Sequence, residues 1–374
     1  MPKFEPLMRN LGFWLSRKLN VPLVCPDTLQ ISLTSRCNLR CKMCSVWENA
    51  NKNDELSLEE IKNVIDQSQE WGIKEINLCG GEPLLSEVCF DVIDYAKKHD
   101  MRVILTTNGT TINENVAKRL LESGLDIITI SLDGAYPQTH DKIRGQPGAY
   151  DKIVQGIRYL NTFKKTSRLV KVLILTISNY NLDELEAYFY LAKDLSVDAL
   201  YLTSVVLDNV KLYSQDSRSE QDDIWIRGER LQRLDEMVDK IDIHQQNLYG
   251  LNYPSFLLIK KYFRRELAKR DWTCFAGYRR FVLVPGGTIQ MCGEAIGNIR
   301  ETPYLKKIWF SRKAGLRRRQ IKKCRNYCLQ DCHAREESAS LSNLFKLFIA
   351  SLAFSLLRVE VATHNGELGS FLNG

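Results

Sequence analysis

The sequence lacks the features that mark several common classes of protein. Its 52 lysines and arginines are nearly balanced by 45 aspartates and glutamates, and this mild net charge of +7 argues against a nucleic-acid-binding protein. No cleavable secretory signal is recognisable, so we expect a cytoplasmic protein. A length of 374 residues excludes a disulfide-stapled mini-protein and allows a full hydrophobic core.

A long uncharged apolar run is also missing. Within the most apolar segment, residues 341–361, only Leu347 to Leu357 is free of charge, which is shorter than the roughly 20 residues that cross a bilayer as a helix. Residues 7–19 are similarly apolar and basic. We expect terminal helices that pack on the protein; the alternative is peripheral contact with the inner face of the membrane. A basic cluster that would attract anionic headgroups consists of Arg312, Lys313, Arg317, Arg318, Arg319, Lys322, Lys323 and Arg325.

Cysteine is abundant, with eleven residues. Because this number is odd and several cysteines are close in sequence, metal ligation in a reducing compartment is favoured over disulfides. Cys37, Cys41 and Cys44 form the run CNLRCKMC, in which a short turn can present three sulfurs to one metal centre. Five more occupy the last third of the chain: Cys274, Cys292, Cys324, Cys328 and Cys332. The isolated cysteines, expected to be buried apolar side chains, are Cys25, Cys79 and Cys89.

Short β-rich runs alternate with amphipathic helical segments from Thr28 to about Leu207. This alternation predicts repeated βα units and a parallel sheet. We expect strands at residues 29–33, 75–79, 102–106, 127–131, 170–176 and 199–203. We expect helices at about residues 58–70, 87–98, 113–123, 150–163 and 182–195. The pattern fits a (β/α)6 partial barrel or a doubly wound sheet, and in both the ligands gather where the strands end.

The distinctive residues follow the first four predicted strands. Because the carboxyl ends of parallel strands meet at one edge, these loops are expected to converge. In chain order they are the run of Cys37, Cys41 and Cys44, then Gly80-Gly81-Glu82-Pro83, then Thr107-Asn108-Gly109, then Leu132-Asp133-Gly134.

The cysteine run and the GGEP loop, in this order and separation, resemble the radical S-adenosylmethionine (SAM) superfamily. That superfamily has a CxxxCxxC motif with an aromatic or apolar residue before the last cysteine, here Met43. The resemblance implies that Cys37, Cys41 and Cys44 hold three irons of a [4Fe-4S] cluster, whose fourth iron stays open for SAM. Read alone, the cysteine run also fits a zinc site with a distant fourth ligand, but the GGEP loop disfavours that alternative.

The resemblance also implies a set of SAM-binding residues. Gly80, Gly81 and Glu82 would meet the methionyl amino group, and two glycines would permit close backbone approach. By position alone, Ser131 and Arg144 would face the ribose and the carboxylate of SAM, since a guanidinium fits a carboxylate well. The alternatives are a serine that caps its strand and an arginine on a polar surface.

The implied reaction is reductive cleavage of SAM to methionine and a 5′-deoxyadenosyl radical. This radical would abstract a hydrogen atom from a peptide or from a small molecule, such as a sugar or a lipid-linked metabolite. A partner such as flavodoxin or ferredoxin would supply the electron. A non-catalytic iron–sulfur or zinc protein, acting as an electron carrier or scaffold, is the alternative.

The C-terminal cysteines suggest a second centre. Cys274 and Cys292 flank a predicted hairpin, residues 281–291, with its turn at Pro285-Gly286-Gly287. The Gly-x4-Cys spacing from Gly287 to Cys292 resembles the SPASM and twitch extensions of radical SAM enzymes, which carry auxiliary iron–sulfur clusters.

A full SPASM extension has seven cysteines and two auxiliary clusters, so the five present here favour one auxiliary [4Fe-4S] cluster of the twitch type. One of Cys324, Cys328 and Cys332 would then be spare. The cluster would accept an electron from a substrate radical or bind the substrate. A structural zinc site is the alternative, since four thiolates suit both.

The sequence therefore predicts the α/β class, as a (β/α)6 partial TIM barrel with a small cluster-binding domain built from a C-terminal β-hairpin and helix. The expected parts are an N-terminal helical extension (1–27), the barrel (28–245), the auxiliary-cluster domain (246–335) and an apolar helix and tail (336–374).

Overall fold

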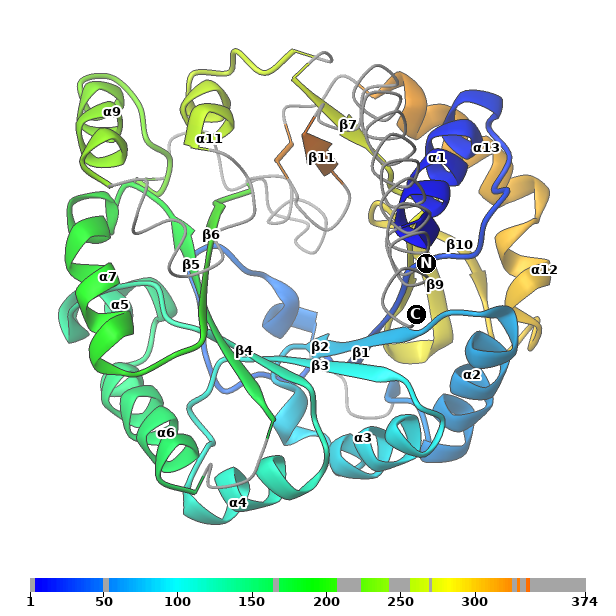
Figure 1. Ribbon diagram of the computed structural model, residues 1–374, viewed down its shortest axis with the longest axis horizontal. Coiled ribbons are helices and arrows are strands. Elements are labelled where there is room, and N and C mark those ends of the chain that lie inside the picture. The colour runs from blue at the N-terminus through cyan, green and yellow to red at the C-terminus, as the bar shows by residue number, and fades with distance from the viewer. Residues whose placement is uncertain are drawn as a thin grey trace, which may run out of the picture.

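The computed structural model describes residues 4–49, 54–163, 168–206, 223–241, 256–268, 271–324, 328–329 and 334–336. These residues form a strongly curved sheet with helices on its outer face (Figure 1). Its strands lie in the order β10-β9-β8-β1-β2-β3-β4-β5-β6, and a separate pair is formed by β11 and β7. The expectations that fall on residues 336–374, apart from Glu336, lie outside the described residues.

Six consecutive parallel strands form the barrel wall, close to the predicted positions. They are β1 (Thr28–Thr34), β2 (Glu75–Gly80), β3 (Arg102–Thr107), β4 (Ile127–Ser131), β5 (Val170–Ile177) and β6 (Ala199–Ser204). The predicted helices are α2 (Leu58–Trp71), α3 (Cys89–Lys98), α4 (Glu114–Glu122), α6 (Ala149–Phe163) and α7 (Leu185–Asp194). They cover one face of the sheet, which confirms the partial barrel over the doubly wound alternative (Figure 1).

Burial alternates along each of these strands. In β1, Leu29, Ile31 and Leu33 are buried against the helices, whereas Gln30 and Ser32 face the concave side and are partly exposed. The same alternation recurs from β2 to β6. A period of two places every second side chain on the concave face, so the sheet presents a partly polar, solvent-reachable interior.

The predicted hairpin continues the barrel sheet. Its first strand β8 (Arg280–Leu283) runs parallel to β1, with Phe281 opposite Leu29. The turn at Pro285–Gly287 leads to β9 (Thr288–Met291), which is antiparallel to β8 and confirms the predicted hairpin. A third strand, β10 (Glu294–Asn298), pairs with β9. The predicted domain boundary near residue 246 stays a prediction.

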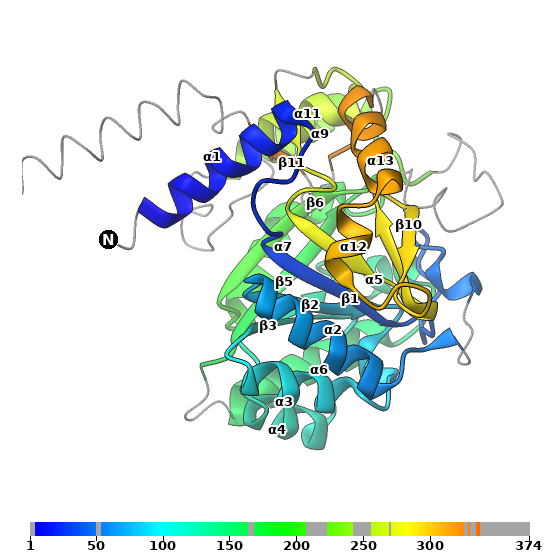
Figure 2. The ribbon, with the colours of Figure 1, turned by 90° about the vertical axis from the view of Figure 1, so that its right-hand side faces the viewer.

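The remaining elements surround this framework. The helices are α1 (Phe4–Leu19), α5 (Pro137–Arg144), α9 (Arg230–Lys240), α11 (Phe256–Phe263), α12 (Leu305–Trp309) and α13 (Arg312–Lys323). The short strands are β7 (Trp272–Cys274) and β11 (Ala334–Glu336), and short 3-10 turns lie at Val46–Asn49, Pro83–Leu85 and Leu182–Glu184. Figure 2 shows α1 on the outside of the barrel, with its N-terminal end farthest from the sheet.

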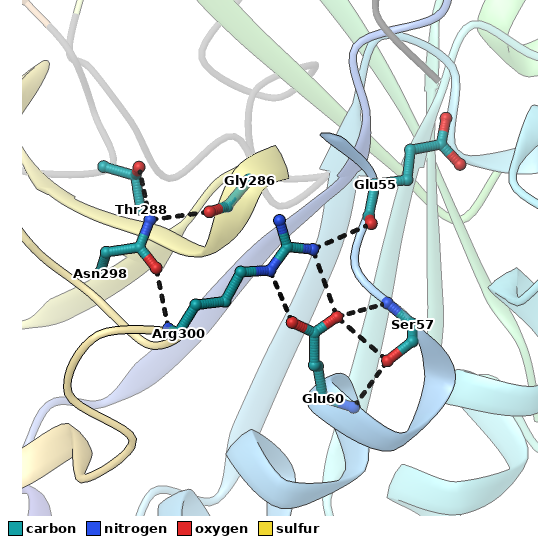
Figure 3. Close-up of polar contacts among 7 residues, drawn as sticks. All are labelled: Glu55, Ser57, Glu60, Gly286, Thr288, Asn298 and Arg300. Atoms are coloured by element: carbon teal, nitrogen blue, oxygen red, sulfur yellow. Dashed lines mark hydrogen bonds and ion pairs between the residues drawn. The ribbon is translucent and has the colours of Figure 1, made fainter. Parts of the chain in front are cut away.

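A polar cluster joins the hairpin to the barrel (Figure 3). Arg300, just after β10, donates from Nε to Glu60 Oε1 at 2.7 Å and from Nη2 to the Glu55 carbonyl at 3.3 Å. Glu60 also completes a capping box with Ser57 at the start of α2. One carboxylate therefore both begins α2 and holds the chain that follows β10.

We expect Arg300→Ala to lower the free energy of unfolding by about 0.5–1 kcal/mol, because the pair is partly exposed. The bond to Arg300 lowers the pKa of Glu60 from 4.5 to about 2. The stabilisation is therefore complete above about pH 4.5 and is lost as the pH falls toward 2. The difference in Tm between wild type and variant should shrink over that interval; a constant difference would contradict the ion pair.

Candidate active site

The three cysteines of the CNLRCKMC run come together in the loop after β1. Cys37, Cys41 and Cys44 pack in one cluster with Leu39 and Ala149, and Cys41 is almost fully buried. Burial, together with the neighbouring charges of Cys41 and Cys37, raises the pKa of Cys44 to about 11. Without a positive centre the Cys44 thiol stays protonated at neutral pH, so metal binding at this sulfur would release its proton.

Several N–H groups are directed at these sulfurs. The backbone N–H of Leu39 donates to Cys37 Sγ at 3.5 Å, and the Asn108 amide lies 3.9 Å from the same sulfur. The guanidinium of Arg144 donates from Nη1 to Cys41 Sγ at 3.6 Å. Such donors stabilise thiolate ligands and the net negative charge of a thiolate-bound centre. Three grouped thiols with N–H donors around them fit a cluster held by three cysteines.

Arg144 also forms a buried ion pair that the sequence did not reveal. Its Nη2 lies 2.6 Å from Asp133 Oδ2, and Asp133, in the loop after β4, is fully buried. The backbone N–H of Thr176 donates to the other Asp133 oxygen at 2.8 Å. Burial opposes the charge of Arg144, but the charges of Asp133 and Cys41 outweigh it and raise its pKa. Arg144 is therefore not the ordinary surface residue that was the alternative.

The glycines of the GGEP loop are required by their contact with the cysteine loop. Gly81 N–H donates to the Thr34 carbonyl at 2.7 Å, and Glu82 N–H donates to the Arg36 carbonyl at 2.8 Å. A Cβ on Gly81 would lie 2.2 Å from the Arg36 oxygen, and one on Gly80, which has φ +136°, would lie 2.4 Å from the Thr34 oxygen. The close contact with the cysteine loop therefore requires glycine at both positions, apart from any contact with SAM.

The Glu82 side chain bonds residues of the neighbouring loop. Its fully buried carboxylate accepts from Thr107 Oγ1 at 2.6 Å and from the Asn108 N–H at 2.7 Å. Burial raises the pKa of Glu82. The carboxylate therefore locks the second βα loop to the third and orients Asn108, whose amide faces Cys37.

Helix α5 fixes the other side of the cysteine loop. The N–H groups of Arg40 and Lys42 donate to the carbonyls of Arg144 and Ile143, at 3.1 and 2.9 Å. The next residue, Gly145, has φ +66°, and a Cβ there would lie 2.4 Å from the Arg40 oxygen. This helix was not predicted, although proline at its first position and glycine just after its last are sequence signals for a short helix.

Ser131 and the residues of the third loop lie at the carboxyl edge of the sheet, as predicted. Ser131 is the last residue of β4, opposite Ile174 of β5, and is partly exposed. Asn108 is nearly buried and donates to Asn38 Oδ1 at 2.9 Å. The four predicted loops thus lie at the carboxyl edge of the sheet. The contacts that the sequence did not indicate are those of Asn108 with Cys37 and of Asp133 with Arg144.

Among the described C-terminal cysteines, Cys274 interacts electrostatically with Cys292 and Cys324. Cys274 ends β7, Cys292 lies in the two-residue turn between β9 and β10, and Cys324 caps α13. Burial raises the pKa of Cys274 to about 11, and the charges of Cys292 and Cys324 add to this effect. Cys328 is partly exposed, and Cys332 lies outside the described residues.

Two further observations concern these cysteines. Cys292 has φ +49°, a left-handed conformation that is uncommon for a residue with a side chain and is often found at functional positions. Within the described ranges, no group of three or more His, Cys, Asp or Glu side chains is placed to hold a single metal ion.

The isolated cysteines lie elsewhere. Cys89 is fully buried in the barrel core, as predicted. Burial raises the pKa of Cys79 to about 11, and its sulfur accepts from Gln30 Nε2 at 3.3 Å. Cys25 and Cys79 are only partly buried, which corrects the prediction that both would be buried apolar side chains. The Cys25 carbonyl accepts from Arg9 at 2.9 Å.

A family comparison agrees with this arrangement. Residues 31–191 match the family described as the Radical SAM superfamily. The AdoMet-dependent heme synthase of Methanosarcina barkeri is 32% identical over 182 residues, which cover 48% of this chain and 51% of that protein. The mycofactocin maturase MftC of Mycolicibacterium smegmatis is 32% identical over 167 residues, or 45% and 42% of the two chains. The chain thus spans about half the length of these curated relatives.

Solved structures show the same fold. Streptococcus suis SuiB bound to S-adenosylmethionine has a TM-score of 0.61 at 17% identity, covering 85% of this chain and 73% of that one. Native anSMEcpe with bound AdoMet has a TM-score of 0.58 at 17% identity, covering 89% and 98%. Residues 31–191 therefore resemble the Radical SAM superfamily, the structure shares the fold of these solved proteins, and the two curated relatives are named as a synthase and a maturase.

We expect Arg144→Leu to destabilise the metal-free protein by about 3–5 kcal/mol, because it leaves the buried Asp133 carboxylate without its cation. Arg144→Lys retains the positive charge and should therefore lose less stability than Arg144→Leu. The double variant Asp133→Leu/Arg144→Leu should also lose less stability than Arg144→Leu alone, because it leaves no unpaired carboxylate. Urea unfolding measures all three; equal losses for the single and double leucine variants would contradict a buried ion pair.

Proposed function

We propose that this protein is a radical SAM enzyme whose [4Fe-4S] cluster is held by Cys37, Cys41 and Cys44. Bound there, the cluster would supply the electron that cleaves SAM homolytically to methionine and a 5′-deoxyadenosyl radical, which would abstract a hydrogen atom from the substrate. The observation that supports it best is the set of three grouped thiols with the N–H donors of Leu39, Asn108 and Arg144. A flavodoxin or ferredoxin would provide the electron.

The chain's own residues would hold the reactants in place. Arg144 joins the cysteine loop to Asp133, and its buried Nε has no hydrogen-bond partner among the described residues, which leaves a donor for the SAM carboxylate. Gly80, Gly81 and Glu82 fix the loop that would meet the methionyl amino group, and Ser131 would face the ribose. Ordered loops at the strand ends would exclude competing hydrogen donors from the radical.

The proposal is tested by anaerobic reconstitution with iron and sulfide, followed by reduction in the presence of SAM. We expect 5′-deoxyadenosine and methionine in equal amounts, detected by mass spectrometry. A filled cluster that yields neither product would favour an electron carrier or scaffold. Zinc retained in place of iron would overturn the proposal.

We further propose an auxiliary [4Fe-4S] cluster bound by Cys274, Cys292 and two of Cys324, Cys328 and Cys332. Its support is the convergence of Cys274, Cys292 and Cys324, and the left-handed backbone at Cys292. We expect about eight irons per reconstituted chain, and about four in Cys292→Ala. Four irons in both proteins would contradict the auxiliary cluster and leave a zinc site as the alternative.

A peptide or small-molecule substrate is proposed for the concave face of the barrel. Its partly exposed polar residues include Gln30, Ser32 and Tyr201. The solved relatives include SuiB bound to the precursor peptide SuiA and anSMEcpe bound to the Cp18Cys peptide, and MftC is a maturase. A deuterated substrate peptide should transfer deuterium to 5′-deoxyadenosine; transfer only from solvent or protein would exclude that peptide.

We also propose a cytoplasmic location with peripheral contact at the inner face of the membrane. Exposed apolar side chains and an adjoining basic helix support it. Over the described ranges, no helix combines the length and the apolar character needed to cross a bilayer.

A further inference from the structure

Helix α1 turns its polar side toward the protein. Arg9 Nη2 donates to the carbonyls of Cys25 and Pro26, both at 2.9 Å, and Arg17 Nε donates to the Cys274 carbonyl at 2.8 Å. Asn20, just after the helix, donates to the Gly315 carbonyl at 3.4 Å. These bonds attach the helix to the barrel through polar groups.

Few of the described apolar side chains of α1 take part in this attachment. Phe13 is fully buried and packs with Phe275 and Tyr278, and Val24 contacts the same cluster. This cluster is separate from the main barrel core. Among the α1 side chains that the structure describes, Phe13 is the one that is both apolar and buried.

The opposite side of α1 is apolar and faces outward. Met8, Leu15 and Leu19 are spaced by seven and four residues, which places them on one side of a helix. Val21 and Leu23 follow in a segment that folds back on the helix, where the Leu23 N–H donates to Ser16 Oγ at 2.8 Å. We call these five side chains the outer face of α1; their exposed fractions lie between 36% and 62%. This arrangement reverses the usual orientation of an amphipathic surface helix.

A cationic surface adjoins the outer face. Helix α13 lies beside the end of α1, because Asn20 bonds Gly315 and Lys322 Nζ bonds the Lys18 carbonyl at 2.8 Å. Helix α13 has no acidic residue, and α1 has none between Met8 and Leu19. Leu316 adds a further exposed apolar side chain. The exposed cations of the two helices are Lys18, Arg312, Lys313, Arg319, Lys322 and Lys323.

Two residues of the predicted basic cluster do not contribute to this surface. Arg318 is buried, donates to the carbonyls of Gly277 and Trp309 at 2.8 Å, and stacks 4.6 Å from the Trp309 ring. Arg317 donates to the carbonyls of Met291 and Cys292. Their role is to hold α13 on the hairpin, which corrects the expectation that they would meet lipid headgroups. Arg325 lies outside the described residues.

We propose that the outer face of α1 and the cations of α13 form a docking surface for an anionic lipid bilayer. Exposed leucines and a methionine would enter the boundary between headgroups and acyl chains, while the lysines and arginines would lie at the anionic headgroups. Charge complementarity favours this occupant over a second copy of the chain, whose α13 would bring cations against cations. The inference rests on the peripheral location proposed above and is independent of the radical chemistry.

The test is flotation of the full-length protein with vesicles, without added iron or SAM. We expect binding to phosphatidylglycerol-rich vesicles at low salt, weak binding to pure phosphatidylcholine, and release at high salt. Leu15→Glu/Leu19→Glu should weaken binding at least tenfold. Tyr190→Glu, at a similarly exposed site on α7, should leave it unchanged.

Two outcomes would overturn the proposal. Wild-type protein that does not bind anionic vesicles would exclude the docking surface, and binding that survives Leu15→Glu/Leu19→Glu would place the lipid contact elsewhere. Size-exclusion chromatography adds a check on folding and on the alternative occupant: a dimer that the double variant dissociates, without vesicle binding by the wild type, assigns the face to self-association. SAM cleavage is measured separately, so neither result affects the proposed reaction.

Discussion

We expect a variant with alanine at Cys37, Cys41 and Cys44 to keep its fold and to form no 5′-deoxyadenosine. The three side chains pack together in a small cluster apart from the main core, so their loss costs little apolar burial. It removes every thiol acceptor of the Leu39, Asn108 and Arg144 N–H groups. Iron content should fall by about four per chain, and product formation should fall below detection.

The matched control is Cys25→Ala, which changes a cysteine outside the cysteine loop. It should retain wild-type iron content and wild-type formation of 5′-deoxyadenosine. Circular dichroism and urea unfolding establish that both proteins are folded. If the triple variant still cleaved SAM, the assignment of these cysteines would be wrong.

We expect Gly81→Ala to reduce the rate of SAM cleavage by at least about 100-fold, because the GGEP loop would have to move away from the cysteine loop. The added Cβ would lie 2.2 Å from the Arg36 carbonyl oxygen, and backbone cannot yield as a flexible side chain does. The same shift would break the 2.7 Å and 2.8 Å bonds that join the loops. Displacement of about 1 Å in a catalytic site is enough for such a loss.

Gly315→Ala is the control for this substitution. Gly315 lies within α13, where a Cβ would meet no atom within 4 Å, so alanine should stabilise the helix by about 0.5–1 kcal/mol. The kinetic assay should show wild-type activity for this variant. Equal activity in Gly81→Ala would mean that the close contact between the two loops is unnecessary.

The strands of the barrel wall were predictable because each contains β-branched or other apolar residues that recur at every second position. Residues 127–131 coincide with β4, four other predicted strands differ from the observed ones by one residue at one end, and β1 is longer than predicted by one residue at each end. The convergence of the motif loops follows from these strands, because parallel strands place their carboxyl ends at one edge of the sheet. Cys37, Gly81 and Ser131 could thus be assigned to one edge before any contact was known.

The contacts within the site could not be predicted in the same way. Asp133 lies in the loop before α5, and Arg144, eleven residues later, is the last residue of α5; nothing in their spacing shows that both are buried. Glu82 has the identity expected for its motif, yet its carboxylate bonds Thr107 and Asn108 in another loop. Such pairings depend on the packing of several elements, which no local pattern encodes.

Contacts between residues far apart in the sequence explain the other differences between the predicted and the observed structure. The hairpin was predicted from its turn, but its attachment to β1 pairs residues about 250 positions apart. The amphipathic character of α1 was visible, but its orientation was not. That orientation follows from partners such as the Cys274 carbonyl, 257 residues from Arg17.

Cys37, Cys41 and Cys44 are proposed to hold a cluster with one iron open to SAM. The most direct measurement is the EPR spectrum of reduced Cys292→Ala protein, in which the proposed auxiliary cluster is removed, recorded with and without SAM. We predict a [4Fe-4S]⁺ signal whose g-values shift when SAM is added, and no such signal when Cys41 is also alanine. A spectrum that SAM leaves unchanged would contradict the claim.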